Sequence, residues 1–467
     1  MALLEARFYE RPVKLRLPFR FGVVTLREAP QLFVRVRIAM LDGRESEGIS
    51  AELLVPKWFD KSPELSNEDN FNQLRRALLI AKRHVIAAGS NTAFGLSAMS
   101  DAGHRAECTR AGLNGLVASF GLALIERAII DAFARIESTP VMALVRTNRL
   151  GLTSGLTPDL VDFDLGKFVA EFSIAKTIFA RHTVGLLDAL TRAETAGKRI
   201  DDGLPESLEE VIASYGHRHF KLKVSGKADA DIDRLAQIAA VLDRIAEPYV
   251  VTLDGNEQYE TVDAVIALWR RVAENKRLAR LKSSTVLIEQ PITRTRALSE
   301  PIHGLDVAVE VDESDADFGI FPQARSLGYR GISAKSCKGF YRALLNRARV
   351  AKYNAEDGGD YFMSAEDLTT QAGIAVQQDL TLAALVGATH VERNGHHYVD
   401  GMAGAPQPEQ DAFLSAHGDL YRRAADGRAR LHIQHGVVSL QSIAQANGLG
   451  TAVKLDWSAM SSSPTVE

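Results

Sequence analysis

The spacing of apolar residues predicts that the chain begins with a small α+β region. In the first fifty residues apolar side chains recur at every second position, as in "FVRVRI", where Val34, Val36 and Ile38 share one strand face. The turn signal "DG" at 42–43 follows and predicts an antiparallel hairpin or meander. From about residue 68 to 137 the apolar residues recur at spacings of three or four, which predicts helices.

After about residue 165 the pattern predicts repeated βα units. Short apolar or β-branched runs alternate there with longer amphipathic segments. The candidate strands lie at 177–184, 219–224, 249–254, 285–290, 307–312, 331–335, 361–365 and 389–393. Each gap has room for a helix, and eight such units close a (β/α)8 barrel. The last sixty or so residues, including "HIQHGVVSL", are expected to return to the first region.

Length and composition are compatible with an α+β region joined to a barrel. A chain of 467 residues exceeds the usual limit for one hydrophobic core, so two lobes or one large barrel with additions are expected. With 46% hydrophobic residues, 24% charged residues and a formal charge of -4, the chain offers no electrostatic case for nucleic acid or anionic lipid. We expect neither a nucleic-acid partner nor a membrane partner.

The cysteines and the chain start favour a cytoplasmic location. Cys108 and Cys337 are far apart and lack CxxC spacing, which argues against a disulfide framework and against a thiolate metal site. No apolar stretch approaches the roughly 20 residues of a membrane span. The opening "MALLEARFYERPVKLRLP" is interrupted by charges too often for a secretory signal. We expect a soluble, unexported protein.

Five consecutive predicted strands end on ionisable residues. The carboxyl ends of barrel strands meet at one rim, where barrel enzymes hold their active sites. In chain order the residues are Lys221 and Lys223, Asp254, Glu289, Asp312 and Lys335. An ordinary polar strand end would explain any one of them, and Asp254 alone could cap a helix.

Three of these strand-end residues are acids, which together predict a metal site. Asp254, Glu289 and Asp312 would repel one another in a rim that excludes water unless a cation lies between them. No histidine or cysteine accompanies them, so Mg²⁺ or Mn²⁺ is favoured over zinc. Open positions would remain for water or substrate oxygens.

The strand-end lysines are candidate proton carriers. The metal-bearing strands lie between the strand of Lys223 and the strand of Lys335, so the two lysines would flank a substrate on opposite faces. A divalent cation and a second lysine nearby would lower a lysine pKa and make the group usable as a general base. Lys221 shares a strand face with Lys223 and is expected to lower its pKa and to contact an anionic substrate. The alternative is two surface lysines at a strand end.

Several motifs around these residues resemble the enolase superfamily. They are "FKLKV", "LDGNEQY", "IEQPI", "VDES" and "ISAKSCKG", which cover the chain from about 220 to 340 in the order found in the family. The resemblance is to the branch typified by muconate-lactonising enzymes, o-succinylbenzoate synthases and dipeptide epimerases. Weaker likenesses are "PFRFGVVTLREAP", "AIIDAFARIESTPVMALV" and "NGLGTAV".

The resemblance implies a modified (β/α)8 TIM barrel with an α+β capping domain made from both ends of the chain. On this basis we expect the N-terminal part of the cap at 1–165, the barrel at 166–420 and the returning C-terminal segment at 421–467. Loops near 19 to 25 and 52 to 59 would close over the barrel mouth.

The resemblance also implies a shared chemical step, the removal of a proton α to a carboxylate through an enediolate. Mg²⁺ would be held by Asp254, Glu289 and Asp312, and Lys223 and Lys335 would be the acid and the base. Strand seven, "YFMSAEDLTT", has no histidine, so the acid–base pair of the mandelate-racemase branch is absent. "THVERNGHHYVDGM" lacks the two-aspartate pattern of dipeptide epimerases, which argues against a dipeptide substrate.

Among possible reactions we favour racemisation or epimerisation of a small carboxylic or amino acid derivative. Cycloisomerisation, and elimination of the dehydratase or synthase kind, use the same residues and stay open. A barrel that binds metal or metabolite without turnover is disfavoured, because all five groups needed for chemistry are present. Symmetric assembly is common among soluble enzymes, so a homo-oligomer is expected.

Other residues could support the site. Asn256 and Glu313 belong to the motifs above, and Glu366 could face the pocket or lie at a helix N-terminus beside Asp367. The substrate-facing candidates of the first region, which an ordinary packed loop would also explain, are Arg20, Phe21, Trp58 and Phe59.

The neighbouring His396 and His397 are a further pair with ionisable rings. Adjacent residues of an extended chain face opposite ways, so we expect a solvated loop rather than catalysis.

Overall fold

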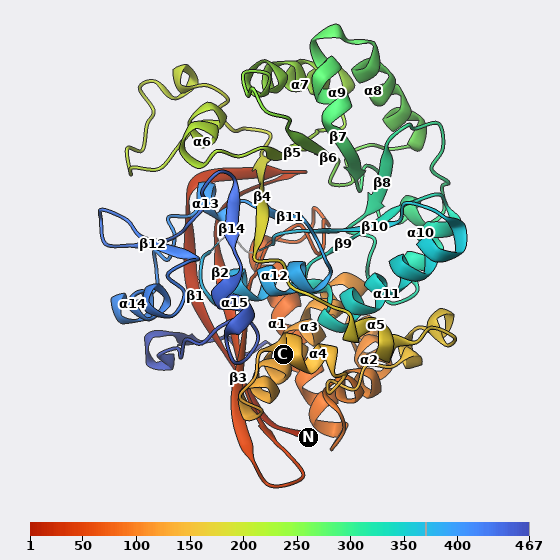
Figure 1. The fold of residues 1–467 in the computed structure, drawn as a ribbon, viewed down its shortest axis with the longest axis vertical. Helices are drawn as coiled ribbons and strands as arrows, with labels where there is room; N and C mark the ends of the chain where they lie inside the picture. Colours follow the sequence, from red (N-terminus) through yellow and green to blue (C-terminus); the bar gives the residue numbers. More distant parts are fainter. Residues whose placement is uncertain (369–370, 467) are drawn as a thin grey trace.

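The alternating apolar residues at the start of the chain form a long antiparallel sheet, as predicted (Figure 1). The computed structural model describes residues 1–368 and 371–466. The sheet order is β15-β1-β2-β3, with bounds β1 (Ala2–Phe21), β2 (Val24–Ala39), β3 (Glu45–Leu53) and β15 (Ser461–Ser462). The predicted "DG" turn joins β2 to β3, and Gly43 adopts a φ of +86°, which favours glycine. A second hairpin turn, with Gly22 at φ +49°, joins β1 to β2.

Helices cover one face of this sheet. They are α1 (Asn67–Ala87), α2 (Ala93–Arg110) and α3 (Gly115–Ile136), followed by the short α4 (Val141–Arg146) and α5 (Leu165–Ala170). Ser66 and Asp69 form a capping box at the start of α1, and the Asn114 side chain accepts hydrogen bonds from the first turn of α3. The central helix α3 is apolar around most of its surface and is buried on nearly all sides.

Eight parallel strands form the closed barrel that the sequence predicts. They are β4 (Thr177–Val184), β5 (His219–Lys223), β6 (Val250–Asp254), β7 (Thr285–Glu289), β8 (Ala308–Val311), β9 (Gly331–Ala334), β10 (Phe362–Ala365) and β11 (His390–Arg393). Neighbours pair in chain order, and β11 pairs with β4 to close the ring. The fold class predicted from the sequence, a (β/α)8 barrel with an α+β cap, is therefore confirmed.

Helices follow the barrel strands. They are α6 (Leu208–Tyr215), α7 (Ala228–Leu242), α8 (Val262–Glu274), α9 (Ala279–Ser284), α10 (Ile320–Ser326), α11 (Phe340–Asp357), α12 (Ile374–Leu385), α13 (Gly395–Tyr398) and α14 (Gln407–Ala416). A short 3₁₀ helix, η6 (Ser336–Lys338), precedes α11.

The C-terminal segment contacts both parts of the molecule. Its other elements are β12 (Tyr421–Arg423), β13 (Ala429–Leu431), β14 (Val437–Ser439) and α15 (Gln441–Gln445). As expected, the chain returns to the first sheet, where β15 pairs with β1. The expectation for "HIQHGVVSL" was wrong: β14 lies in this stretch and pairs with the barrel strand β4. The reason is that β4 begins at Thr177 but pairs with β5 only from Arg181 onward. The first residues of β4 therefore have a free edge on that side, where β14 pairs.

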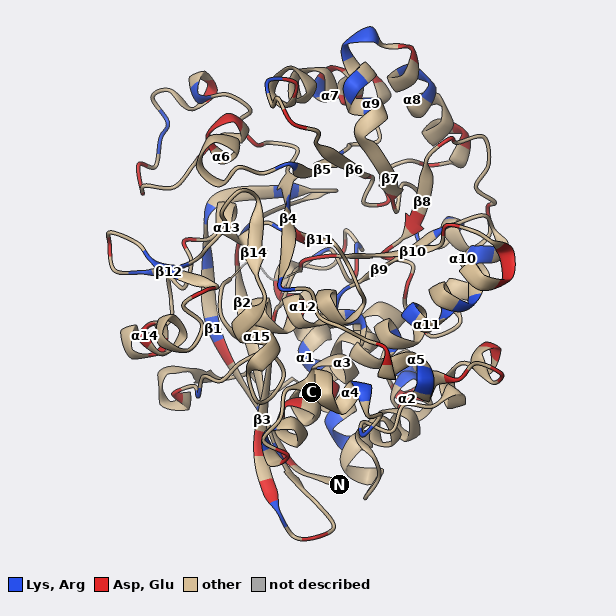
Figure 2. Cartoon of the chain, in the orientation of Figure 1, with Lys and Arg blue, Asp and Glu red and all other residues tan. Residues whose placement is uncertain are grey.

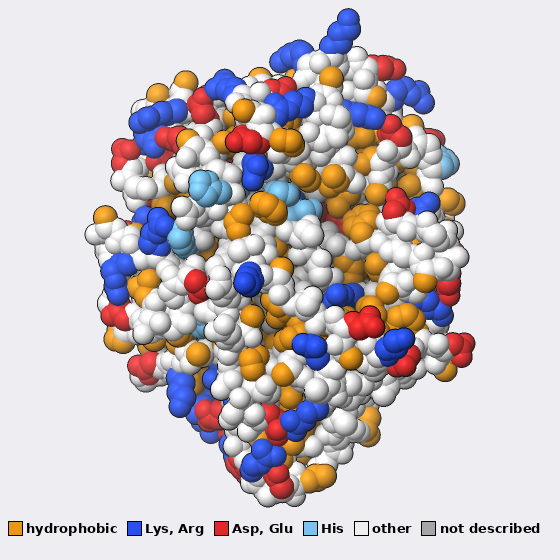
Figure 3. All heavy atoms as spheres, viewed as in Figure 1, with side chains coloured by type: hydrophobic (Ala, Val, Ile, Leu, Met, Phe, Trp, Pro, Cys, Tyr) orange, Lys and Arg blue, Asp and Glu red, His pale blue; other side chains and the backbone are white. Residues whose placement is uncertain are grey.

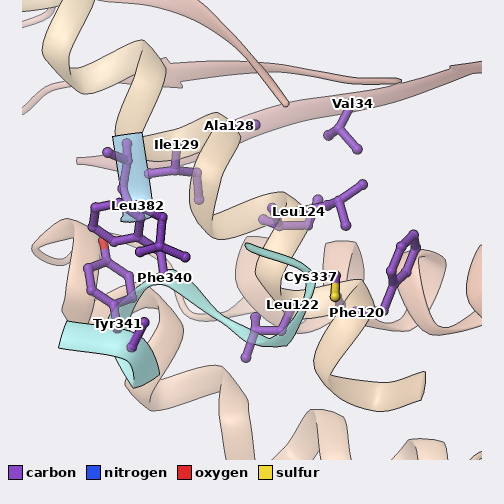
Figure 4. Packing of buried hydrophobic residues seen from close by; sticks show 14 of the residues in the cluster. Val34, Phe120, Leu122, Leu124, Ala128, Ile129, Cys337, Phe340, Tyr341 and Leu382 are labelled. Carbon is purple, nitrogen blue, oxygen red and sulfur yellow. The ribbon is translucent and has the colours of Figure 1, made fainter. Parts of the chain in front are cut away.

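A shared apolar core joins the first region to the barrel (Figure 4). Leu122, Leu124 and Ile129 of α3 lie between Val34 of β2 and the segment that follows β9, which contributes Cys337. This segment begins directly after the candidate base Lys335. The packing of α3 therefore helps to fix the position of the backbone next to Lys335.

Glu126 of α3 is a buried carboxyl group in the contact between α3 and the segment after β9. Its carboxylate accepts hydrogen bonds from Ser97 Oγ and from the backbone N–H of Phe340, and burial raises its pKa from 4.5 to about 7. A carboxyl group with a raised native pKa stabilises the fold when protonated, and this contribution is lost as the pH rises through the native pKa.

We therefore expect the free energy of unfolding to fall from pH 5 to 8 more steeply in the wild type than in Glu126→Gln. The difference in slope should reach about 1.4 kcal/mol per pH unit between the two pKa values. Urea unfolding at pH 5, 6, 7 and 8 measures it. The substituted side chain can keep both contacts, because its amide oxygen can accept from Phe340 N–H while its NH₂ group donates to Ser97 Oγ. Parallel curves for the two proteins would contradict the assignment.

The surface carries charge of both signs. On the face shown in Figure 3, basic and acidic side chains are interspersed, in line with the small net charge of -4. Within the described residues, no helix has both the length and the apolar composition needed to cross a lipid bilayer.

Candidate active site

The ionisable strand ends predicted from the sequence meet at one end of the barrel. Inward and outward positions alternate along each strand, so Lys221 and Lys223 of β5 both point inward. The strand register places Lys223 beside Asp254, and Asp254 beside Glu289. Figure 2 shows acidic residues at the ends of β7 and β8. All six predicted residues are at most 6% exposed.

Two lysine–carboxylate pairs stand on opposite sides of the barrel. Lys223 Nζ donates to Asp254 Oδ2 at 2.5 Å, and Lys335 Nζ donates to Asp312 Oδ2 at 2.6 Å. Because β5 and β9 are four strands apart in a ring of eight, the two ammonium groups face the axis from opposite walls. This is the arrangement that the sequence predicted for two proton carriers.

The carboxylate neighbours of Lys335 determine the direction in which its pKa moves. Burial and Lys221 favour the neutral amine, but Asp312, Glu289 and Glu366 outweigh them and raise the pKa of Lys335. The lowered lysine pKa that the sequence predicts depends on a bound divalent cation and stays a prediction. The ion pair with Asp312 thus favours the charged form of Lys335.

Lys221 lies among carboxylates. Its Nζ is 2.7 Å from Glu289, 3.0 Å from Asp254, 2.6 Å from Glu366 and 2.9 Å from Glu392. Burial alone would lower the pKa of Lys221, but these four acids raise it well above its usual range. Besides lining the cavity, this ammonium group neutralises the acids on the barrel axis.

A second layer of charge lies deeper in the barrel. Arg181 of β4 is buried and pairs with Glu366. Glu310 of β8 is also buried, and neither of its carboxylate oxygens has a hydrogen-bond partner within the described part of the chain. Burial and the neighbouring Glu366 raise the pKa of Glu310 to about 8.

The carboxylates offer two overlapping ligand sets for a hard cation. Oxygens of Glu289, Glu310 and Glu366 lie within 4.8 Å of one another. Neither Asp254 nor Asp312 belongs to that group, and their nearest charged partners are Lys223 and Lys335. Glu289 is common to this inner set and to the set predicted from the sequence. The all-oxygen donors and the unpartnered oxygens of Glu310 fit Mg²⁺ chemically.

The first region closes over the barrel mouth. A cavity is lined by Phe19, Phe21, Leu26, Val55, Trp58, Lys221, Lys223, Asp254, Asn256, Lys335, Asp367, Leu368, Glu392 and Asn394. Phe21 and Trp58 thus lie where the sequence predicted, and Lys335 Nζ is 5.0 Å from the centre of a Trp58 ring. The resemblance correctly implied that segments near 19 to 25 and 52 to 59 cover the site.

Two predicted cap residues face elsewhere. Arg20 does not line the cavity, because on β1 it points away from the face shared by Phe19 and Phe21. Phe59 packs edge-on against Phe120 of α3. Among the aromatic residues that line the cavity, sequence reasoning missed Phe19, which strand periodicity from Phe21 would have identified.

Asn256 and Glu313 support the site. The backbone N–H of Asn256 donates to Asp254 Oδ1 at 2.9 Å, and its side chain donates to Glu313 Oε1 at 3.2 Å. Asn256 has a φ of +42°, a conformation that asparagine tolerates better than most residues. Lys61 from the cap also donates to Glu313 at 3.3 Å. Glu313 is fully buried, and it links the loop after β6 to the cap.

Sequence reasoning also missed several charged residues. Lys338 Nζ lies 3.2 Å from Asp312 Oδ1 and 3.0 Å from Ser333 Oγ, so Asp312 contacts two lysines. Glu310 and Glu392 occupy inward positions on β8 and β11. The available signal was strand periodicity, since Glu310 stands two residues before Asp312.

His396 and His397 are buried, so the predicted solvated loop was wrong. Both residues lie in the short helix α13, and the chain around them packs against β1.

Neither a family model nor a curated protein sequence matches this chain. Solved structures do match it. An enolase superfamily member from Roseovarius nubinhibens, complexed with magnesium, has 16% identity and a TM-score of 0.58, with 98% of this chain and 97% of that chain covered. The chain shares the enolase superfamily fold.

Other matches are enzymes with that fold. A dipeptide epimerase from Enterococcus faecalis, complexed with Mg and L-Leu-L-Tyr, has 14% identity and a TM-score of 0.60, with 96% and 99% coverage. The 2-chloromuconate cycloisomerase from Rhodococcus opacus has 17% identity and a TM-score of 0.59, with 98% coverage of each chain.

Proposed function

We propose that this protein is a Mg²⁺-dependent enzyme that removes the proton α to the carboxylate of a small acid. The observation that carries the proposal is the position of Lys223 and Lys335 on opposite walls of one buried cavity, with Glu289 and Asp254 between them. The magnesium complexes among the matching structures support the cofactor. Mn²⁺ has the same preference for oxygen ligands and is an alternative.

Different residues of the chain would bind the metal ion, transfer the proton, position the lysines and exclude water. Bound among the carboxylates, Mg²⁺ would neutralise the negative charge that develops on the substrate carboxylate when the α-proton leaves. Lys223 and Lys335 take or return that proton at their Nζ atoms, one on each face of the α-carbon. Asp254 and Asp312 hold these two atoms in place. Phe19, Phe21 and Trp58 exclude water from the cavity.

We propose racemisation or epimerisation of a carboxylic or amino acid derivative as the reaction. Lysines on both faces allow removal of a proton from one side and its return on the other. One observation favours a second candidate, cycloisomerisation: Lys335 Nζ donates to Asp312 Oδ2 at 2.6 Å, an ion pair that favours the charged form of the lysine. A permanently charged Lys335 would stabilise the intermediate, while Lys223 alone would move the proton.

Chiral chromatography on a substrate panel separates these reactions. The panel contains single enantiomers of N-acyl amino acids and 2-substituted acids, together with unsaturated diacids such as cis,cis-muconate. Each is incubated with the protein and Mg²⁺. Appearance of the opposite enantiomer supports the racemase, and lactone formation from a diacid supports the cycloisomerase. A panel in which no acid reacts would contradict the proposed function.

A further inference from the structure

Three histidines come together outside the barrel. His182 is in β4, His217 precedes β5, and His396 is in α13. Their ring nitrogens lie within 4.8 Å of one another, and the side chains are 1%, 1% and 8% exposed. The neighbours of His182 on β4 point into the barrel, so His182 points outward, away from the catalytic carboxylates. None of the three takes part in the proposed reaction.

The closest nitrogens face one atom, His396 Nε2. His182 Nδ1 lies 3.1 Å from it, and His217 Nε2 lies 3.2 Å from it. The other nitrogen of His217, Nδ1, donates to the carbonyl of Ala180 at 2.9 Å. In the neutral ring, the lone pair of His217 Nε2 therefore points into the cluster.

No assignment of protons to the three histidine rings gives each of the facing nitrogens a good hydrogen bond. If His396 Nε2 carries its proton, that proton must be shared between two acceptors. If His396 Nε2 carries a lone pair, it faces the lone pair of His217 at 3.2 Å. His396 Nδ1 is buried and has no hydrogen-bond partner in the part of the chain that the structure describes.

A metal ion accounts for all three nitrogens. Zn²⁺ binds imidazole at about 2.0–2.1 Å, so the nitrogens of a tetrahedral site stand about 3.3 Å apart. His396 Nε2 lies 3.1 Å from His182 Nδ1 and 3.2 Å from His217 Nε2, close to this nitrogen–nitrogen distance. We propose that His182, His217 and His396 form a binding site for a transition-metal dication, with Zn²⁺ the favoured ion. Imidazole ligands prefer such ions, whereas the barrel carboxylates prefer Mg²⁺.

A small cavity borders one of the three histidines. A cavity of about 20 Å³ borders His396 and Tyr215, and this volume holds a single water molecule. Three histidines leave one position of a tetrahedral site open, so a water molecule or another small ligand would complete it.

The position of α13 indicates what the metal stabilises. Tyr398, two residues after His396, stacks on Phe19 with ring centres 4.3 Å apart. The carbonyl of His397 accepts a hydrogen bond from Arg16 of β1 at 2.8 Å. A metal that ties α13 to β4 would therefore also hold the β1–β2 hairpin over the barrel mouth, because Phe19 lines that cavity.

Metal analysis of the full-length protein tests the proposal. The protein is equilibrated with ZnCl₂ in excess Mg²⁺, which competes for the carboxylates, then desalted and analysed by plasma mass spectrometry. We expect one Zn²⁺ per chain in the wild type and in Glu289→Gln, and less than a tenth of that in His396→Gln. His397→Gln is the matched control, a buried histidine of the same helix outside the cluster, and should keep its Zn²⁺.

Two further readouts keep the proposal testable if His396→Gln folds poorly. His182→Gln should lose Zn²⁺ in the same way. Substitution by Co²⁺ should give the intense visible absorption of a tetrahedral site in the wild type and not in either variant. Zn²⁺ that stays below a tenth of an equivalent in the wild type would overturn the proposal and leave a hydrogen-bonded histidine cluster. Retention of Zn²⁺ by both His396→Gln and His182→Gln would also overturn it.

Discussion

Replacing Glu289 by Gln should weaken Mg²⁺ binding by more than about 100-fold and abolish turnover, because loss of even a supporting group near a metal costs 10–100-fold. Glu289 is the one carboxylate that belongs both to the inner group with Glu310 and Glu366 and to the set predicted from the sequence. Isothermal titration with Mg²⁺ measures the affinity. An unchanged Mg²⁺ affinity would show that the ion binds elsewhere.

The same substitution should leave the fold intact. Burial, Asp254 and Glu366 raise the pKa of Glu289 well above its usual range, so a neutral amide suits the position. Urea unfolding without Mg²⁺ is therefore expected to show no loss of stability. Two matched variants identify the remaining ligands: Glu310→Gln weakens Mg²⁺ binding if the inner set holds the ion, and Asp312→Asn does so if the predicted set holds it.

Replacing either Lys223 or Lys335 by Ala should lower the rate of enantiomer interconversion by about 10²–10⁴-fold, the usual contribution of a general acid or base. The two variants should differ in which enantiomer still exchanges. Each keeps one lysine and so can remove the α-proton from one face only. Proton NMR in D₂O, started from each enantiomer in turn, measures the remaining exchange.

Lys227→Ala is the matched control for these variants. Lys227 follows β5 closely but is exposed, so its loss should leave exchange of both enantiomers unchanged. Full exchange of both enantiomers in Lys223→Ala and in Lys335→Ala would show that neither lysine moves the proton. Loss of all exchange in Lys223→Ala alone would favour the one-base cycloisomerase.

Much of the fold could be predicted because barrel strands carry a local signal. The run that ends in Glu289 is short and apolar, and its polar end is followed by Pro291, which cannot continue the hydrogen-bond ladder. Asp254 and Lys335 end their strands in the same way. Parallel strands in a barrel bring such ends to one rim, so residues far apart in the sequence could be placed together.

The contacts within the rim could not be predicted, because they depend on side-chain packing across the barrel. Lys221 lines the cavity, as its predicted contact with the substrate requires, but its contacts with four acids were not predicted. His396 was expected in a solvated loop because adjacent residues of an extended chain face opposite ways, but it lies in α13, and the packing of α13 against β1 buries it. Both features depend on distances between elements that no local pattern encodes.

Exchange of the α-hydrogen in D₂O by the unmodified protein tests the proposed proton abstraction most directly. With Mg²⁺ present, at least one acid of the substrate panel should lose its α-proton signal in the proton NMR spectrum as deuterium replaces it. Exchange should stop after EDTA treatment and return when Mg²⁺ is added back. No exchange for any acid, or exchange that persists after EDTA, would contradict a metal-dependent proton abstraction at this barrel mouth.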